Sequence, residues 1–380
     1  MWYLAVSCEK VRTQPFSYEE EVTLKVGLDV GSTTIKCVVL DDADNLIYST
    51  YERHFSHILE KSEELLRRMA EQYVPGGKAE FAISGSAGMG MAESVEVPFV
   101  QEVFATRVAA TRLAPGTDCI IELGGEDAKI LFLTGGMEVR MNGSCAGGTG
   151  AFIDQMATLL KMSADEMDAA AQKAEKTYTI ASRCGVFAKS DIQPLLNQGV
   201  AKADLALSTF HAIAKQTIGG LSQGLDITPP VIFEGGPLTF NPTLVRVFCE
   251  RLQLSEDEII RPAHPDTIVA LGAALSIPEL FGQDATDVHV LDHVIAQLRQ
   301  AETQRKHVVS KHAEPYFSTE QACRAWRKLH ESPQIPPITA QAGDTLRVYI
   351  GVDAGSTTSK LVLIDEQETV IDKFYANNRG

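Results

Sequence analysis

The sequence predicts an α/β protein in which several strands end in phosphate-binding turns. The octapeptide at 29–36 (DVGSTTIK) lies between two apolar, β-prone runs and returns almost unchanged at 353–360 (DAGSTTSK). Two diglycine turns, at 124–125 and 235–236, each follow another apolar run. Segments with a helical spacing of apolar residues lie between the predicted strands. Such a mixture of strands and helices indicates an α/β fold.

The turn at 29–36 is the first candidate phosphate-binding loop. Gly31 followed by the hydroxyl residues Ser32, Thr33 and Thr34 exposes backbone N–H and side-chain O–H donors in one concave turn. Asp29 can hold a hydrated Mg²⁺ ion just ahead of this turn, and Lys36 adds positive charge behind it. One such turn is compatible with an ordinary hairpin, but two copies indicate a duplicated phosphate-binding domain.

The other elements follow from apolar runs and periodicity. In chain order they are paired strands at 23–48, a helix at 55–73, a strand at 81–83, a helix around 101–113, a strand at 119–123, a strand pair at 128–140, helices from 151 to 223, a strand at 231–233, and helices at 243–253 and 267–275. The strand at 119–123 delivers Glu122 to the turn with Gly124, Gly125 and Asp127. The strand at 231–233 leads into Gly235, Gly236 and Pro237.

Composition limits the class of protein. The net charge of −16 argues against a nucleic-acid-binding face, which would be basic. No run of eighteen apolar residues predicts a membrane-spanning helix, and the N-terminus is a poor signal peptide, so we expect a cytoplasmic protein without membrane partners. Seven cysteines without a C-x-x-C pair indicate reduced thiols.

Two cysteines lie in loops rich in small residues. Cys145 precedes a predicted helix that Thr149 can cap, so the positive end of the helix dipole would stabilise a thiolate or an anionic cluster there. Cys184 lies in a similar loop beside Arg183. Two cysteines cannot complete a four-thiolate [4Fe–4S] site, but a twofold dimer would supply four. Two buried structural thiols are the alternative.

The order of the turns resembles that of the actin/Hsp70/sugar-kinase superfamily, and no Walker A sequence is present. This resemblance implies a ribonuclease H-like ATPase domain at 23–280, with lobe I at about 23–115 plus 268–280 and lobe II at about 116–267. It makes 29–36 and 122–129 the phosphate loops and 233–237 the adenosine loop. It also implies roles for single residues. Asp29 and Asp127 would hold Mg²⁺ and its waters, Glu122 would orient the attacking water, and Lys36 would lie close to the phosphates.

The two cysteine motifs indicate one family within this superfamily. Cys145-Ala-Gly-Gly-Thr-Gly and Ser-Arg-Cys184-Gly-Val-Phe-Ala closely resemble the cluster-ligand motifs of the BadF/BadG/BcrA/BcrD ATPases. That family includes the 2-hydroxyacyl-CoA dehydratase activators and the ATPase subunits of benzoyl-CoA reductase, and the resemblance covers roughly 25–280. One departure is Glu122, where the family usually has Asp; the longer carboxylate could move the attacking water and slow hydrolysis.

The second departure from the family pattern is the order of domains along the chain. Residues 281–345 are dominated by polar and charged side chains and predict a solvated helical linker. We expect 346–380 to be the severed start of a second activase-like domain, as in large fused members of the family. The copy at 353–360 lacks the other turns and the cysteines within this chain, so we expect it not to bind ATP.

The family resemblance implies an ATP-driven one-electron donor. Its cofactors would be ATP/ADP, Mg²⁺ and one [4Fe–4S] cluster per dimer, held by Cys145 and Cys184. The partners would be a second copy, or the chain's own second domain, with ferredoxin or flavodoxin as donor and a dehydratase- or reductase-like iron–sulfur protein as acceptor. The alternatives are a sugar-type small-molecule kinase and an Hsp70-like nucleotide switch without redox chemistry.

Overall fold

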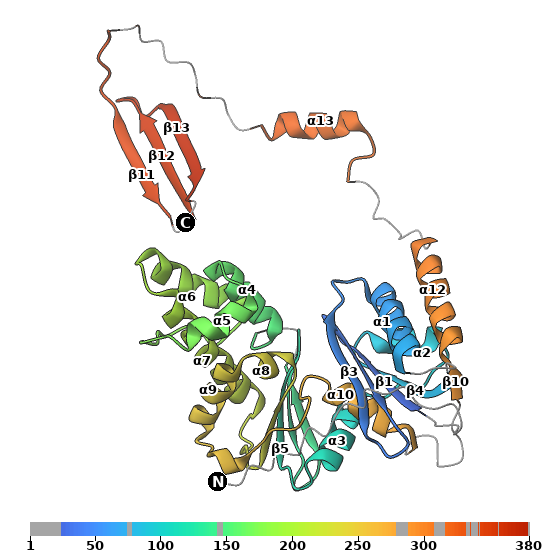
Figure 1. Ribbon diagram of the computed structural model, residues 1–380. Helices are drawn as coiled ribbons and strands as arrows, with labels where there is room; N and C mark the ends of the chain where they lie inside the picture. Colours follow the sequence, from blue (N-terminus) through green and yellow to red (C-terminus); the bar gives the residue numbers. More distant parts are fainter. Residues whose placement is uncertain are drawn as a thin grey trace. The chain divides into compact units, whose positions relative to one another are not determined.

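Three sheets form the β structure of the computed structural model (Figure 1). It describes residues 24–73, 78–142, 147–278, 288–307, 316–331, 335, 341, 343–355 and 357–378. Two compact units are distinguished: the first contains the elements from β1 to α12, and the second contains α13 and β11 to β13 together with Gln193–Val200. The predicted α/β class is confirmed.

The first sheet, with its helices, is called lobe I. Its strand order is β10-β4-β1-β2-β3, with bounds β10 (Val288–Val290), β4 (Lys78–Ser84), β1 (Leu24–Val30), β2 (Thr34–Leu40) and β3 (Leu46–Arg53). The central strand β1 pairs antiparallel with β2 and parallel with β4. Nearly every side chain of β1 and β2 is buried, which is typical of strands covered on both faces.

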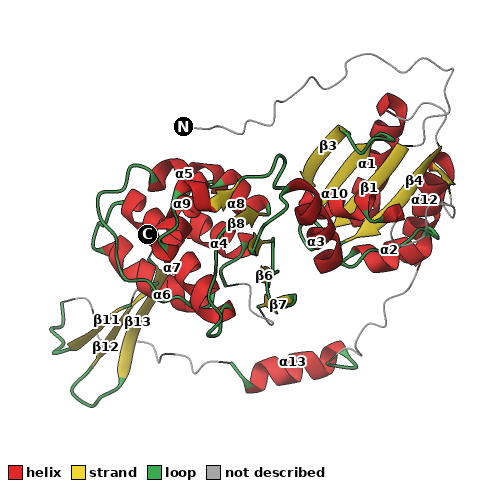
Figure 2. Ribbon diagram, turned by 90° about the horizontal axis from the view of Figure 1, so that it is seen from below, coloured by secondary structure: helices red, strands yellow, loops and turns green. Residues whose placement is uncertain are grey.

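Helices cover both faces of the lobe I sheet (Figure 2). One core contains α1 (Ile58–Tyr73), α2 (Gly88–Ser94) and α12 (Leu291–His307); α3 (Glu102–Leu113) and α10 (Ile268–Leu275) contribute to the others. Glycines allow close packing around α10: a Cβ on Gly27 would overlap the carbonyl oxygen of Ala270, and one on Gly272 would overlap that of Ala105. The helix α10 thus packs directly against β1 and α3.

The second sheet, with its helices, is called lobe II. Its strand order is β7-β6-β5-β8-β9, with bounds β7 (Glu138–Met141), β6 (Ala128–Phe132), β5 (Cys119–Leu123), β8 (Val231–Glu234) and β9 (Ile259–Ile260). Strand β5 is antiparallel to β6 and parallel to β8. This register places Lys129 on one side of Glu122 and Glu234 on the other.

Helices dominate the rest of lobe II. They are α4 (Gly150–Leu160), α5 (Ala164–Ala171), α6 (Gly185–Asn197), α7 (Lys202–Leu221), α8 (Gly236–Phe240) and α9 (Pro242–Leu252), with a 3₁₀ turn at Glu256–Glu258. The long helix α7 packs against α4, α5 and α9. The Phe233 and Phe248 rings, 5.7 Å apart, join β8 to α9. The short helix α8 therefore starts from a rigid base.

The structure differs from the predicted solvated linker at 281–345. Strand β10 adds to the edge of the lobe I sheet, and α12 packs against α1. The apolar residues of α12 recur at helical spacing and enter the core: Leu291, Val294, Ile295 and Leu298. Burial of this stripe outweighs the polar composition of the segment. Residues 288–307 thus belong to the first unit.

The second unit repeats the hairpins of lobe I in a smaller sheet. It contains α13 (Glu320–Leu329) and the strands β11 (Tyr349–Ala354), β12 (Thr358–Ile364) and β13 (Val370–Asn377), in the order β11-β12-β13. Asp353 pairs with Lys360 as Asp29 pairs with Lys36. Most side chains of β11 are exposed, whereas those of β1 are buried. In the part of the chain that is described, no helix has the length and apolarity needed to cross a membrane.

Candidate active site

The first predicted phosphate turn joins β1 to β2. The N–H of Gly31 donates to the carbonyl of Thr34 at 2.9 Å, and the ring Nε2 of buried His54 lies 3.1 Å from the Gly31 oxygen. Lys36 Nζ donates to Asp29 Oδ2 at 2.7 Å across the two strands. Burial opposes the charge on Lys36, but the Asp29 carboxylate outweighs it and raises the Lys36 pKa. Lys36 is therefore charged at neutral pH.

The second turn contains a buried lysine shared by three carboxylates. Lys129 Nζ lies 2.7 Å from Glu102 Oε2, 3.0 Å from Glu122 Oε1 and 2.7 Å from Asp127 Oδ2. Burial favours neutral Lys129, yet these carboxylates raise its pKa. Burial also raises the pKa of Glu122, and the charge of Lys129 counteracts part of this rise. Glu122 Oε2 is buried and has no hydrogen-bond partner.

The third turn follows β8 and contains a glutamate without a cationic partner. Glu234 is 1% exposed, and neither carboxylate oxygen has a hydrogen-bond partner. Burial raises its pKa well above the ordinary value, and the neighbouring charge of Glu122 raises it further. Gly235 has φ +89°, and a Cβ there would overlap the backbone of Leu123. The turn thus packs directly against the end of β5.

The three turns meet around one cavity, here called the central cleft. Its inner part is lined by Asp29, Thr34, Lys36, Tyr51, Glu122, Gly124, Gly125, Glu234, Gly235, Gly236, Pro265, Asp266, Ile268 and Val269. Its outer part is lined by Thr33, Thr34, Tyr51, Arg53, Gly125, Gly150, Ala151, Ile153, Asp154, Ala164, Asp165, Gly236, Pro237, Phe240 and Asn241. Segments far apart in the sequence therefore face one space.

Side chains from both lobes touch across the central cleft. Arg53 of β3 makes two hydrogen bonds to the Asp154 carboxylate of α4, at 2.9 and 3.2 Å. The rings of Tyr51 and Phe240 meet edge to face with centroids 5.3 Å apart. A Cβ on Gly125 would overlap the Thr33 side chain. The glycine allows the two phosphate turns to approach each other.

Most of the predicted nucleotide-binding residues line the central cleft, but not all. Gly31 and Ser32 line neither part of it, and Asp127 is turned toward Lys129. Cys145 lies outside the described residues. The predicted site thus comes together around Asp29, Lys36 and Glu122, whereas Asp127 contributes to the ion cluster beneath it.

Cys184 lies at the N-terminal end of α6. Its carbonyl accepts hydrogen bonds from the N–H groups of Phe187 and Ala188, at 3.1 and 3.2 Å. Gly185 packs so closely on α4 that a Cβ would overlap the Gln155 side chain. Val186 and Phe187 are 72% and 52% exposed. Cys184 therefore stands beside the helix that follows the Cys145 loop, next to exposed apolar side chains.

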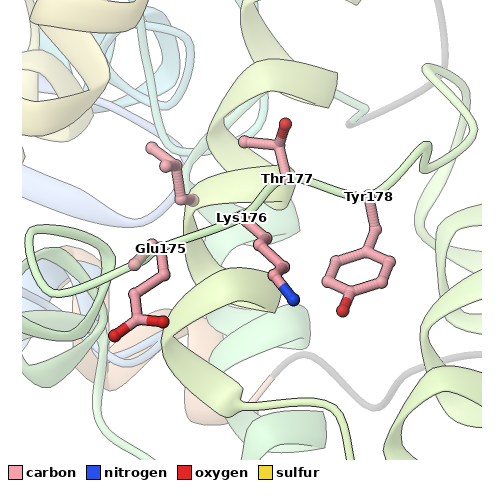
Figure 3. A pocket seen from close by; sticks show the side chains of 6 residues that line it. Glu175, Lys176, Thr177 and Tyr178 are labelled. Atoms are coloured by element: carbon pink, nitrogen blue, oxygen red, sulfur yellow. The ribbon is translucent and has the colours of Figure 1, made fainter.

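A separate pocket lies in lobe II (Figure 3). It is formed by Ala174, Glu175, Lys176, Thr177, Tyr178 and Leu207. The N–H groups of Glu175 and Lys176 donate to the Asp204 carboxylate of α7, at 2.9 and 3.1 Å. Its lining contains no residue of the predicted site.

Sequence reasoning gave no individual role to four residues in or next to the central cleft. Tyr51 and His54 lay outside the predicted loops, whereas Lys129 and Glu234 lay within the loops at 122–129 and 233–237 but had no role of their own. A lysine within a buried strand was a signal for Lys129, because such a charge needs partners. A carboxylate at the end of the apolar run Val231–Phe233 was the corresponding signal for Glu234. Tyr51 and His54 gave no local signal, since their contacts depend on how β3 packs.

Comparisons with known proteins agree with this geometry. The model of the BadF/BadG/BcrA/BcrD ATPase family matches residues 26–276. The (R)-2-hydroxyglutaryl-CoA dehydratase activating ATPase of Acidaminococcus fermentans is 27% identical over 56% of this chain and 82% of its own. The 2-hydroxyisocaproyl-CoA dehydratase activator of Clostridioides difficile is 28% identical over 66% of this chain and 93% of its own. The solved structure of the activator of the 2-hydroxyisocaproyl-CoA dehydratase from Clostridium difficile, with bound ADPNP, is also similar. Its TM-score is 0.57 and its sequence identity is 25%, and the match covers 75% of this chain and 98% of the other.

Proposed function

The chain belongs to the BadF/BadG/BcrA/BcrD ATPase family, and we propose that its ATP hydrolysis drives electron transfer to an iron–sulfur partner enzyme. The electron would leave a [4Fe–4S] cluster shared across a dimer and reach a 2-hydroxyacyl-CoA dehydratase-like or benzoyl-CoA reductase-like protein. The relatives named as dehydratase activators support this proposal. The observation that carries it is the position of α4, which lines the central cleft and also meets Gly185, the residue after Cys184, through Gln155.

The nucleotide would lie in the central cleft. The turn with Gly31, Ser32, Thr33 and Thr34 would surround phosphate oxygens with N–H and O–H donors, as would Gly124 and Gly125. Lys36, charged and next to Asp29, would attract the polyphosphate. Gly235, Gly236 and Pro237 would contact the nucleoside, since their glycines allow close approach.

Hydrolysis requires a polar group beside the terminal phosphate. Glu122 would orient the attacking water through its unpartnered Oε2, while Lys129 fixes the other oxygen. Asp29, on the opposite side of the cleft, would hold Mg²⁺ through its waters, and Asp127 would act through Lys129. Mg²⁺ would neutralise phosphate charge when bound. The oxygen ligand that such a hard ion prefers is present at Asp29, whose carboxylate lines the inner part of the cleft.

The cluster would be held by Cys145 and Cys184 of each subunit. The N-terminal end of α6 suits an anionic group, because its N–H groups and the helix dipole favour negative charge. The cluster supplies a one-electron couple when bound. Nucleotide-dependent rotation of the lobes would open the helices around Cys145 and Cys184. Val186 and Phe187, exposed beside Cys184, would contact the dimer mate or the partner enzyme. Ferredoxin or flavodoxin would supply the electron.

Anaerobic purification tests the proposal directly. The protein should be brown and contain about four irons per dimer. Cys145→Ser and Cys184→Ser should each abolish the cluster while leaving ADP binding intact. Cys249→Ser is the matched control, since this half-buried thiol lies on α9, outside both loops.

Two results would contradict the proposal. Iron-free, colourless protein with sugar-dependent ATP turnover would indicate a kinase of the same fold. Loss of ADP binding in the Cys184→Ser variant would instead place that residue in the nucleotide site. A dimer that persists without iron, measured by light scattering, would separate subunit contact from cluster binding.

A further inference from the structure

Glu122 and Glu234 form a carboxylate pair at the floor of the central cleft. They are register partners on the parallel strands β5 and β8, so their side chains leave the sheet on the same face. Both are nearly fully buried and line the inner cavity. Both oxygens of Glu234 and the Oε2 of Glu122 have no hydrogen-bond partner. Three unsatisfied oxygens therefore lie beside the same space.

The charges around the pair do not balance. Lys129 is shared by Glu102, Glu122 and Asp127, and it makes no ion pair with Glu234. Lys36 is already paired with Asp29. A buried carboxylate without a partner is costly, and a polyphosphate bound beside it adds repulsion. A cation bound between the pair and the phosphates would offset both the burial of an ionised Glu234 and this repulsion.

We propose that Glu234 binds a divalent cation of the Mg²⁺ type that links it to the nucleotide's phosphates, while Glu122 reaches the same cation through the water that its Oε2 orients. This inference rests on the proposed nucleotide site. Oxygen ligands suit a hard cation, and Mg²⁺ is commonly held by one or two carboxylates plus phosphate oxygens and water. The described residues contain no preformed group of three or more acidic, His or Cys ligands. Two carboxylates with phosphates and water complete the shell in this arrangement.

This cation site is separate from the one proposed at Asp29. One Asp29 oxygen accepts from Lys36, and a Cβ at Gly85 would overlap the other, so its carboxylate is closely surrounded. Glu234 has neither constraint on its oxygens. The carboxylates at 122 and 234 approach the cleft from lobe II, whereas Asp29 approaches from lobe I. Glu234 thereby gains a role that no sequence motif assigns.

Mn²⁺ binding measured by electron paramagnetic resonance tests this site. The full chain is titrated with Mn²⁺ in the presence of a non-hydrolysable ATP analogue. Glu234→Gln keeps the shape of the side chain and removes its charge; it should abolish one bound Mn²⁺ or weaken it at least tenfold. Glu234→Asp should restore part of that binding. Glu80→Gln is the matched control, because Glu80 is buried in β4 with an unpartnered oxygen but lies outside the cleft; it should leave Mn²⁺ binding unchanged.

The outcomes separate this inference from the proposed function. Unchanged Mn²⁺ binding in Glu234→Gln, with native circular dichroism, would overturn the cation site and leave Glu234 as a neutral buried acid. Asp29→Asn should retain the Mn²⁺ that depends on Glu234; loss of all bound Mn²⁺ there would refute a separate site. ADP binding in excess Mg²⁺ is measured alongside. Its absence from the wild type would contradict the proposed nucleotide site, whatever the result with Mn²⁺.

Discussion

At the scale of single residues, burial separates two otherwise equivalent lysines. Lys36 and Lys360 each pair with the aspartate that begins their octapeptide, at 2.7 and 2.6 Å. The Lys36–Asp29 pair is 16% and 4% exposed, whereas the Lys360–Asp353 pair is 44% and 63% exposed. Removing one partner of a buried pair leaves an uncompensated charge, while an exposed pair contributes little.

Lys36→Ala should therefore lower the free energy of unfolding by about 3 kcal/mol and abolish ATP hydrolysis. Lys360→Ala is the matched control from the same chain, and it should leave stability nearly unchanged, because solvent screens an exposed pair. Urea unfolding and a phosphate-release assay measure the two effects. Equal losses in both variants would show that burial is not what distinguishes the copies.

The pKa of Glu234 predicts a dependence of stability on pH. Its pKa is raised by burial and by Glu122, so the folded protein keeps a proton that the unfolded chain releases above its ordinary pKa of 4.5. Stability from this group is present below that pH and is lost as the pH rises toward the folded-state value. Glu234→Gln should therefore stabilise the apoprotein at pH 8 by more than about 1 kcal/mol.

Urea unfolding between pH 5 and 8, in EDTA and without nucleotide, measures this difference. The increase in the free energy of unfolding caused by Glu234→Gln should become smaller as the pH falls toward 5. Glu122 and Lys129 remain in both proteins, so their own titration contributes to both curves. Parallel curves for the two proteins would show that Glu234 is charged in the folded state despite its burial.

At the scale of elements, close approach of backbones fixes α10. A Cβ at Gly272 would overlap the backbone of Ala105 in α3, and neither backbone can move without disturbing the sheet beneath it. Gly272→Ala should therefore cost about 1–3 kcal/mol through overpacking. Gly220→Ala in α7 meets nothing within 4 Å and should stabilise by about 0.5 kcal/mol. Thermal unfolding of both variants checks that the two substitutions change stability in opposite directions.

The helix α12 gives a second test at this scale. Leu298 is 1% exposed in the lobe I core, so Leu298→Ala should cost about 2–5 kcal/mol. Leu329 on α13 is 81% exposed, and Leu329→Ala should change stability by less than about 0.5 kcal/mol. Denaturant midpoints measured by circular dichroism compare the stability of the two variants. A neutral Leu298→Ala would return this segment to the role of a solvated linker.

At the scale of the whole ATPase part, contacts across the central cleft should slow nucleotide release. The Arg53–Asp154 pair spans the lobes but is half exposed, so it contributes about 0–1 kcal/mol. Arg53→Ala should thus speed dissociation of a fluorescent ADP up to about fivefold, as measured by stopped flow. Arg246→Ala removes a comparable exposed pair within α9 and should have no effect. Equal rates in all three proteins would show that Arg53 does not restrain the cleft.

Local patterns were enough to predict part of this arrangement. The β1–β2 turn and the two diglycine turns could be predicted because each signal lies within a few consecutive residues. The place of α12 was missed because the polar composition of its segment was weighed above the spacing of Leu291, Val294, Ile295 and Leu298. The pairing of Glu122 with Glu234 depends on β5 lying beside β8, about 110 residues later in the sequence. Contacts of that kind are set by tertiary packing.

The open edge of β11 has a consequence for handling the protein in concentrated solution. Strand β1 has a neighbour on each side, but among the described residues β11 pairs only with β12. Ile350 and Val352 of β11 are 62% and 67% exposed. An apolar strand with unpaired N–H and C=O groups is a template for intermolecular pairing and aggregation. Val352→Lys would put a charge on that edge and improve colloidal stability.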